Sequence, residues 1–363
     1  MEGMGNDHWQ KRNAIDIRRS RSRNSVLLTI SVAACNVDKW IEPCLQSFAD
    51  YRFLGRVEVF VIDDGGTDRT MEIAKIYADK IPGIFTLVHK ENEGWGSTVM
   101  YSIRHAHGRY LRIVDGDDLV DTDALEAELR ILEQTDVDMI YTPHIEFSDD
   151  SDGSLIERKE CGWTDPELRQ GSFLLNEVVD HMQLCMHNSA FRASILRQHV
   201  DLPGNCYYTD NNFMFEAVHH SKTVYLLPQY VYLYRKGRPG QSTSQENFRS
   251  HLKDYKEVIE EMIQYLGENG LITRVETDTP TDRRIVLNLA GMVMDQFGRE
   301  LCLGPNGKYG EDLHHFNELI HCISPLLINM KWKCKTMTIM LQFLGYRVTS
   351  YLVKEYNLFR KRY

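Results

Sequence analysis

The first third of the chain alternates short apolar runs with longer amphipathic stretches. The short runs are rich in β-branched residues, which is typical of buried strands, and the longer stretches repeat apolar residues at helical spacing. Strands are predicted over residues 26–32, 57–62, 85–89 and 110–114, and helices over 39–48, 70–78 and 97–107. This alternation predicts an α/β fold with a Rossmann-like, mostly parallel central sheet and helices on both faces.

The rest of the chain changes from a mixed pattern to a mainly helical one. After residue 245 the pattern is helical almost throughout, interrupted by glycine and proline. Before it we expect strands over 136–147, 223–227 and 230–235, helices over 172–179, 194–198 and 211–219, and an exposed acidic loop over 148–153.

A length of 363 residues exceeds the ~250–300 at which a single core stops growing. We therefore expect several parts. They are a flexible basic tail (1–24), an α/β domain (25–240) with a nucleotide-binding half (25–120) and an acceptor half (121–240), and a helical C-terminal domain (241–363).

Charge and cysteine spacing exclude several classes of protein. A net charge of -10 disfavours a nucleic-acid binder, because neutralising phosphates requires clustered basic residues. The eight cysteines form no C-x-x-C pair, so we expect reduced thiols in a cytoplasmic protein. No apolar stretch reaches the ~18 residues that span a bilayer. We expect the basic, aromatic segment 331–362 to contain a buried helix. The alternative is a peripheral helix that contacts the inner face of a membrane.

Acidic residues follow two of the predicted strands. Ligands bind at the carboxyl ends of the strands in sheets of this kind. Asp115-Gly116-Asp117-Asp118 places two carboxylates at one strand end, where they suit Mg²⁺ or Mn²⁺ together with substrate phosphates. An exposed acidic turn, with Asp118 capping the helix that begins near Thr122, is an equally good interpretation of this segment alone.

The segment from Ile30 to Asp118 resembles the family 2 glycosyltransferases, which have the GT-A fold. Four elements occur in the order and spacing of that family: Ala33-Ala34-Cys35-Asn36, Asp63-Asp64-Gly65-Gly66-Thr67-Asp68, Asn92-Glu93-Gly94, and Gly108-Arg109-Tyr110 before Asp115-Gly116-Asp117-Asp118. The resemblance implies a nucleotide-sugar donor, a divalent cation, and surface-polysaccharide synthesis of the bacterial type.

Roles for the three strand-end carboxylates follow from this resemblance. It implies that Asp64 accepts a hydrogen bond from the base, that Asp115 lies near the ribose, and that Asp117 is the principal metal ligand. For Asp63 and Asp68 we expect structural roles, in the turn and at the following helix.

Three further positions are candidates for nucleotide binding. Ala33 and Cys35 stand where the family commonly has proline or threonine and an aromatic residue. Lys90, just past the third strand, could present a cation to the nucleotide, or could simply be solvated.

The second half supplies a candidate base. Thr209-Asp210-Asn211-Asn212-Phe213 resembles the E-D-x-x-F element of the family, in which the aspartate is the catalytic base, although Thr209 replaces the glutamate. Asp210 could equally be a helix cap. Arg235 or Arg238 could contact the diphosphate, because guanidinium groups match phosphate geometry.

The resemblance implies an inverting glycosyltransferase that moves a sugar, expected from UDP, to a hydroxyl of a glycan or lipid-linked acceptor. Two alternatives remain open. A sugar-phosphate nucleotidyltransferase also needs acidic metal ligands, but residues 33–36 offer no glycine-rich phosphate loop. A non-catalytic nucleotide-sugar-binding protein is conceivable because of Cys35 and Thr209.

Overall fold

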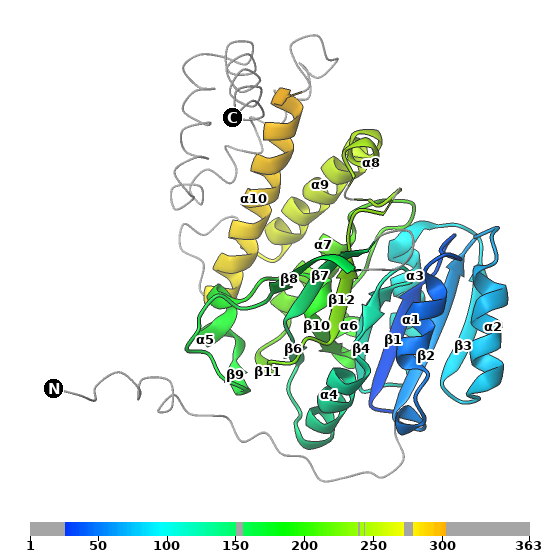
Figure 1. Ribbon diagram of the computed structural model, residues 1–363. Coiled ribbons are helices and arrows are strands. Elements are labelled where there is room, and N and C mark those ends of the chain that lie inside the picture. Colours follow the sequence, from blue (N-terminus) through cyan, green and yellow to red (C-terminus); the bar gives the residue numbers. More distant parts are fainter. Residues whose placement is uncertain (1–25, 150–154, 239, 243, 272–278, 303–363) are drawn as a thin grey trace, which may run out of the picture. The chain divides into compact units, whose positions relative to one another are not determined.

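The computed structural model describes residues 26–149, 155–238, 240–242, 244–271 and 279–302 (Figure 1). The chain divides into two units, with the division between Asp254 and Tyr255. The predicted tail (1–24) and segment 331–362 lie outside the described residues.

An eight-stranded sheet organises the first unit, in the order β3-β2-β1-β4-β10-β6-β11-β9 (Figure 1). Strands β1 to β4 pair in parallel, as the sequence predicts. Their bounds are β1 (Leu28–Ala33), β2 (Val57–Asp64), β3 (Phe85–Lys90) and β4 (Tyr110–Asp115).

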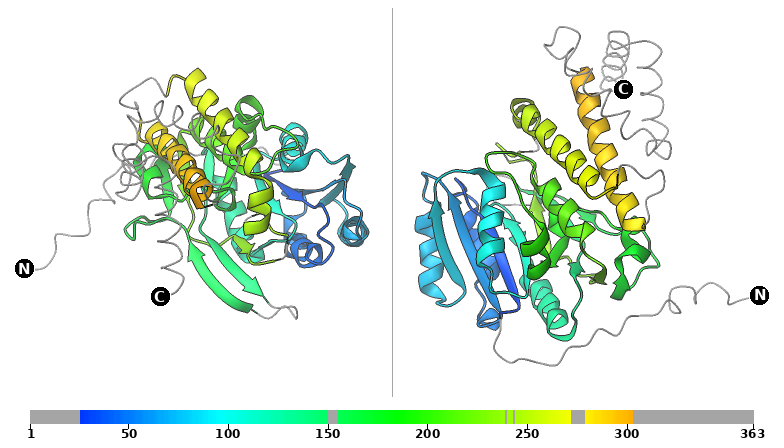
Figure 2. Two further views of the ribbon diagram at one scale, coloured as in Figure 1. Left: turned by 90° about the horizontal axis from the view of Figure 1, so that it is seen from above. Right: turned by 180° about the vertical axis from the view of Figure 1, so that it is seen from behind.

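Helices cover both faces of this parallel part. The face towards α1 (Ile41–Phe48) and α2 (Thr70–Lys80) holds the main hydrophobic core, which includes Leu28, Ile30 and Val32 of β1. Since side chains alternate along a strand, Ser31 lies on the other face. There its hydroxyl accepts a hydrogen bond from Ser102 of α3 (Gly94–His105) at 2.7 Å. Figure 2 shows α3 from behind the sheet.

The second half of the sheet is mixed rather than parallel. Strands β10 (Ser189–Arg192) and β9 (Gly171–Leu174) pair with their neighbours antiparallel. The prediction missed β10, and it assigned to one helix a segment that contains β9 and the short helix α5 (Leu175–Val178). The remaining strands are β6 (Met139–Tyr141) and β11 (Thr223–Leu226).

A smaller sheet, in the order β5-β12-β7-β8, lies beside the first. The strand predicted over 136–147 is two strands, β6 and β7, which belong to different sheets. Pro143 stands between them and has no N–H to continue a ladder. The bounds in this sheet are β5 (Leu119–Val120), β7 (His144–Asp149), β8 (Leu155–Cys161) and β12 (Tyr232–Arg235).

The other helices lie mostly where the apolar spacing predicts them. In the first unit they are α4 (Thr122–Gln134), α6 (Ala193–His199), α7 (Asp210–His219), α8 (Gln245–Ser250), and the 3-10 turns η1 (Tyr51–Phe53), η2 (Val179–His181) and η3 (Met186–Asn188). Most of α9 (Leu252–Glu268), and α10 (Pro280–Cys302), form the described part of the second unit. The expected helical C-terminal region is confirmed to this extent.

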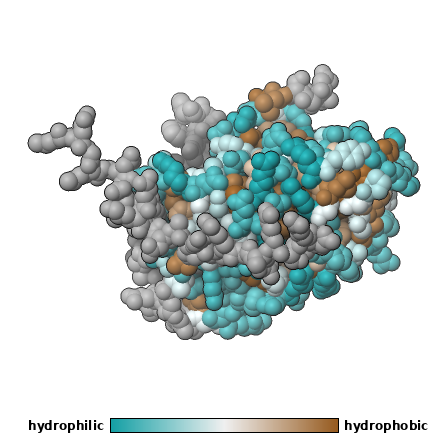
Figure 3. All heavy atoms as spheres, turned by 90° about the horizontal axis from the view of Figure 1, so that it is seen from below, coloured by the Kyte–Doolittle hydropathy of each residue, from teal (hydrophilic) through white to brown (hydrophobic). Residues whose placement is uncertain are grey.

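The described helices include none long and apolar enough to cross a membrane. On the face seen in Figure 3, hydrophilic residues surround scattered hydrophobic ones. Segment 331–362, for which membrane contact is the alternative, lies outside the described residues.

A buried ion pair fastens α4 to the sheet. Arg112 of β4 donates to Glu128 of α4 at 2.9 Å, and both side chains are fully shielded from solvent. Arg112 also donates to the carbonyl of His187 at 3.2 Å. A buried guanidinium depends on such partners, because losing one leaves charge without compensation.

We expect Glu128→Ala to lower the free energy of unfolding by about 3–5 kcal/mol, because Arg112 then stays buried without its counter-charge. Glu133→Ala, on the same helix, is the matched control. Glu133 pairs with Arg56 at 3.6 Å and is half-buried, so its loss should cost about 1 kcal/mol or less. Urea denaturation measures the free energy of unfolding of both variants. Equal losses would show that the buried ion pair contributes no more to stability than the partly exposed one.

Candidate active site

The parallel strands bring their carboxyl ends to one edge of the sheet. Ala33 at the end of β1 is the register partner of Asp115 at the end of β4. Asp64 at the end of β2 is the partner of Lys90 at the end of β3. Four of the residues predicted to bind the nucleotide therefore lie along a single edge.

Asp64 is buried and accepts several hydrogen bonds. Lys90 donates to its carboxylate, and so do the backbone N–H groups of Glu93 at 3.0 Å and Gly94 at 2.8 Å. These two amides belong to the N-terminus of α3, which favours a negative charge. Asp64 thus couples the end of β2 to the start of α3, and Lys90 is held by an ion pair rather than solvated.

Asp63 and Asp68, the other two carboxylates near the end of β2, have the structural roles that the sequence predicts for them. Asp63 accepts from Gly66 N–H at 2.8 Å, and Asp68 accepts from Thr70 N–H at 2.9 Å at the start of α2. Gly65 has a φ of 74°, and a Cβ there would lie 2.9 Å from the Asn92 side chain. Both the positive φ and the lack of space for a Cβ require glycine at this position.

Cys35 lies next to the same turn. Its thiol donates to the Asp64 carbonyl at 3.3 Å. Partial burial and the nearby carboxylates of Asp63 and Asp64 raise the thiol pKa, so Cys35 is neutral at pH 7. A small neutral side chain stands where the family commonly places an aromatic ring.

Asp115 is held by an indole. Trp95 of α3 donates Nε1–H to its carboxylate at 2.9 Å, and the Asp115 N–H donates to the Tyr232 hydroxyl at 3.2 Å. Gly116 follows, where a Cβ would lie only 2.8 Å from the Ala33 carbonyl oxygen. The strand end can pass this close to β1 only because residue 116 is glycine.

Asp118 is not the cap of an exposed turn. Its side chain is fully buried, accepting from the Tyr232 hydroxyl at 2.6 Å and from Arg235 N–H at 2.7 Å. The cap of α4 is Asp121, which accepts from Ala124 N–H at 2.8 Å. The alternative interpretation of this segment is therefore wrong, because tertiary partners from β12 bury the acidic turn.

Asp117 faces an arginine instead of water. Arg238 forms an ion pair with its carboxylate, and the Arg238 guanidinium also lies over the Trp40 ring, 5.1 Å from the centroid. Arg235 donates Nε–H to the Asp117 carbonyl at 2.8 Å and pairs with Asp149. Arg235 is thus committed to the fold, whereas Arg238 is partly exposed on the loop after β12.

Asp210 is the first residue of α7 and half-buried. Asn211 donates to its carboxylate at 3.3 Å, and the side chain of Thr209 provides no cap. Desolvation raises the pKa of Asp210 to about 6. Asp210 also raises the pKa of Asp115 electrostatically, so the two carboxylates are close enough to interact through their charges.

Raised pKa values mark several carboxylates of this cluster. Burial, followed by the charge of Asp117, raises the pKa of Asp115 to about 7. The same two causes raise the pKa of Asp118 well above its usual range. Groups so perturbed in one place are characteristic of functional sites.

Two residues of the site have no part in the sequence prediction. Tyr232 links Asp115 to Asp118, and Trp95 binds Asp115. Trp95 directly follows the Asn92-Glu93-Gly94 element, so its position in the sequence indicates that it lies near the site. Tyr232 lies more than 100 residues from its partners, and the sequence assigns it no role.

A mostly parallel sheet flanked by helices, with carboxylates gathered at its carboxyl edge, is the arrangement expected of a transferase domain of the GT-A type. Residues 29–200 match the model of Glycosyl transferase family 2. Residues 29–200, just under half of the chain, are therefore similar to a family 2 glycosyltransferase domain, as the sequence predicts, and the predicted fold is shared with solved structures.

Curated relatives and solved structures agree with this assignment. The putative glycosyltransferase EpsH of Bacillus subtilis (strain 168) is 31% identical over 123 residues, which are 34% of this chain and 35% of EpsH. The chain thus aligns with about a third of the length of that relative.

Two solved structures share the fold at low sequence identity. TarS 1-349 of S. aureus, in complex with UDP-GlcNAc, has a TM-score of 0.67 and 16% identity, covering 91% of both chains. The mannosyltransferase PcManGT of Pyrobaculum calidifontis, in complex with GDP-Man and Mn2+, has a TM-score of 0.50 and 14% identity, covering 97% of this chain and 92% of that one.

The raised pKa of Asp115 predicts how stability depends on pH. In the unfolded chain an aspartate titrates near ~3.9, so between about pH 4 and 7 the folded protein binds the extra proton. Stability therefore falls as pH rises through this window, by up to about 1.4 kcal/mol per pH unit for one proton.

Asp115→Asn should flatten this slope, because the amide does not titrate. Urea denaturation of metal-free protein at pH 4.5, 5.5, 6.5 and 7.5 measures it for both proteins. A slope unchanged in the variant would show that Asp115 ionises normally.

Proposed function

We propose that this protein is an inverting glycosyltransferase that moves a sugar from a nucleoside diphosphate, most simply UDP, to an acceptor hydroxyl. The observation that carries the proposal is the meeting of Asp115, Asp117 and Asp210 at one end of the sheet of a family 2 domain. Asp115 ends β4, Asp117 follows it, and Asp210 begins α7, so metal, donor and acceptor can converge there.

The donor lies in this proposal across the carboxyl ends of β1, β2 and β4. Ala33 and Cys35 leave room beside the nucleotide, Asp64 accepts from the edge of the base, and Asp115 lies near the ribose. Asp64 is already engaged by Lys90, so Lys90 must share its ammonium with the bound nucleotide or release the carboxylate. The complex of TarS with UDP-GlcNAc supports UDP as the nucleotide.

The residues around Asp117 fit a divalent cation. Its carboxylate is nearly buried, and the positive charge that it now contacts belongs to the partly exposed Arg238. A carboxylate that is paired with a movable cation in the free protein can exchange it for Mn²⁺ or Mg²⁺, both of which prefer oxygen ligands. A cation bound there would stabilise the charge of the departing diphosphate.

Arg238 is the arginine that we assign to the diphosphate. Once the cation holds Asp117, the guanidinium is free to turn to the phosphates, whose geometry it matches. Arg235 keeps its contacts with Asp117 and Asp149 and positions the loop.

Asp210 takes the proton of the attacking acceptor hydroxyl. A base works best when its pKa lies near the working pH, and burial brings the pKa of Asp210 from about 4 to about 6. The attack displaces the nucleoside diphosphate from the anomeric carbon in one step, which inverts its configuration.

The acceptor and the location complete the proposal. Surface-polysaccharide synthesis by similar bacterial enzymes favours a glycan or a lipid-linked acceptor on the cytoplasmic side of a membrane. A reducing compartment would fit the described cysteines that form no disulfide bond, which are Cys35, Cys44, Cys161, Cys185 and Cys206.

Asp210→Asn tests the base. The amide keeps the shape of the side chain but cannot take a proton, so transfer should fall by about 10²- to 10⁴-fold while donor affinity and melting temperature stay close to wild type. In the wild type, kcat should rise with pH through about 6, as Asp210 ionises. The exposed Asp201→Asn serves as the control and should be silent. Near-wild-type transfer by Asp210→Asn would remove Asp210 from the chemistry.

Asp117→Asn tests the metal ligand. Calorimetry with UDP should show an affinity that rises on addition of Mn²⁺ in the wild type and stays constant in the variant, because the carboxylate that ties cation to protein is lost. Metal-free UDP binding, measured on the same samples, should be equal in the two proteins. A normal response to Mn²⁺ in the variant would place the cation elsewhere.

A further inference from the structure

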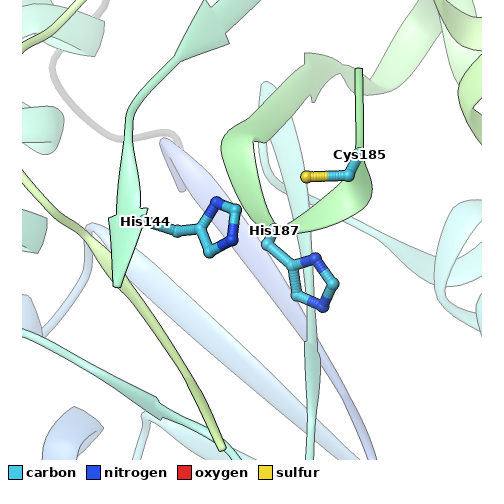
Figure 4. A group of neighbouring side chains, drawn as sticks. All are labelled: His144, Cys185 and His187. Carbon is cyan, nitrogen blue, oxygen red and sulfur yellow. The ribbon is translucent and has the colours of Figure 1, made fainter. Parts of the chain in front are cut away.

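A second group of ligand-type side chains lies beside the D-x-D segment. One ligand atom from each of His144, Cys185 and His187 lies within 4.8 Å of the others. His144 begins β7, and the other two flank Met186 at the η3 turn. Figure 4 shows the Cys185 sulfur pointing towards His144, with the two imidazoles next to each other.

A buried amide orients two members of this group. The Asn188 side chain is fully buried, and its Oδ1 accepts from the Cys185 thiol and lies 3.2 Å from His144 Nδ1. Its Nδ2 donates to the Thr142 carbonyl at 2.7 Å, which fixes the direction of the amide. With Nδ1–H donated to Asn188, the Nε2 lone pair of His144 is left for a metal. Outer-shell partners of this kind orient ligating histidines.

Aromatic contacts hold the third member. The His187 ring lies 4.3 Å from that of Tyr234 and 4.8 Å from that of Tyr232, measured between centroids. All three side chains are therefore placed before any ion arrives.

We propose that His144, Cys185 and His187 form a Zn²⁺ site that is separate from the cation site at Asp117. Two imidazoles and a thiolate are ligands that Zn²⁺ prefers, whereas Mg²⁺ and Mn²⁺ prefer oxygen. The Cys185 thiol loses its proton to solvent as the sulfur–zinc bond forms. The ion ties the start of β7 to the η3 turn.

The site bears on the active site through His187. A ring nitrogen of His187 and carboxylate oxygens of Asp115 and Asp118 also lie within 4.8 Å of one another. An ion bound to His187 would therefore hold this imidazole in place beside Asp115 and Asp118. Three protein ligands leave a fourth position of a tetrahedral ion open to water.

Titration of the full-length protein with Co²⁺, without nucleotide, tests the proposal. Co²⁺ substitutes for Zn²⁺, and a thiolate ligand gives a near-ultraviolet sulfur-to-cobalt charge-transfer band. We expect this band at one equivalent in the wild type and in Asp117→Asn, and its loss in Cys185→Ser. Cys161→Ser is the matched control, because Cys161 is the β8 register partner of His144 but is not a ligand in the proposed set.

Calorimetry with Zn²⁺ gives the second measurement. His187→Gln should weaken binding by more than the roughly 10- to 100-fold that loss of an outer-shell partner costs, so it decides the matter even if Cys185→Ser fails to fold. Absence of the charge-transfer band in the wild type, its persistence in Cys185→Ser, or its loss in Cys161→Ser would each overturn the proposal.

Discussion

The crowding of carboxylates at the carboxyl edge of the sheet is the constraint on which the rest of the structure depends. Asp115, Asp117 and Asp118 lie together where water is largely excluded, and the charge of Asp117 raises the pKa of both Asp115 and Asp118. A folded chain tolerates such a group only where donors and positive charges surround it. Much of the architecture around β12 supplies them.

β12 and the loop after it are built to compensate this charge. Tyr232 and the backbone of Arg235 donate to Asp118, and Arg238 pairs with Asp117. β12 pairs with β5, which directly follows the D-x-D segment in sequence, so Tyr232 and Arg235 are held next to these carboxylates. The compensation is incomplete, because the pKa of Asp115 still lies near 7. A divalent cation would complete it.

Local patterns predicted the parallel half of the fold and the carboxylates that lie at its carboxyl edge. Buried parallel strands are continuous apolar runs, so β1 to β4 are visible from composition alone, and their ends carry the family elements. The later strands are short, and partners distant in sequence define them. Ser189–Arg192 is a strand because β4 and β6 leave a gap that it fills.

The same distinction explains which site residues the sequence could not supply. The sequence suggests that Asp118 is an exposed cap, because a segment with three acidic residues in four seldom lies in a core. The residues that bury Asp118 are Tyr232 and Arg235, more than 100 positions later in the sequence. The His144, Cys185 and His187 group has no regular spacing, since the turn at η3 and the start of β7 meet only in the folded chain. Functional residues that follow one another at a single strand end can be predicted from the sequence. Functional residues that come from two sheets can be identified only from the folded structure.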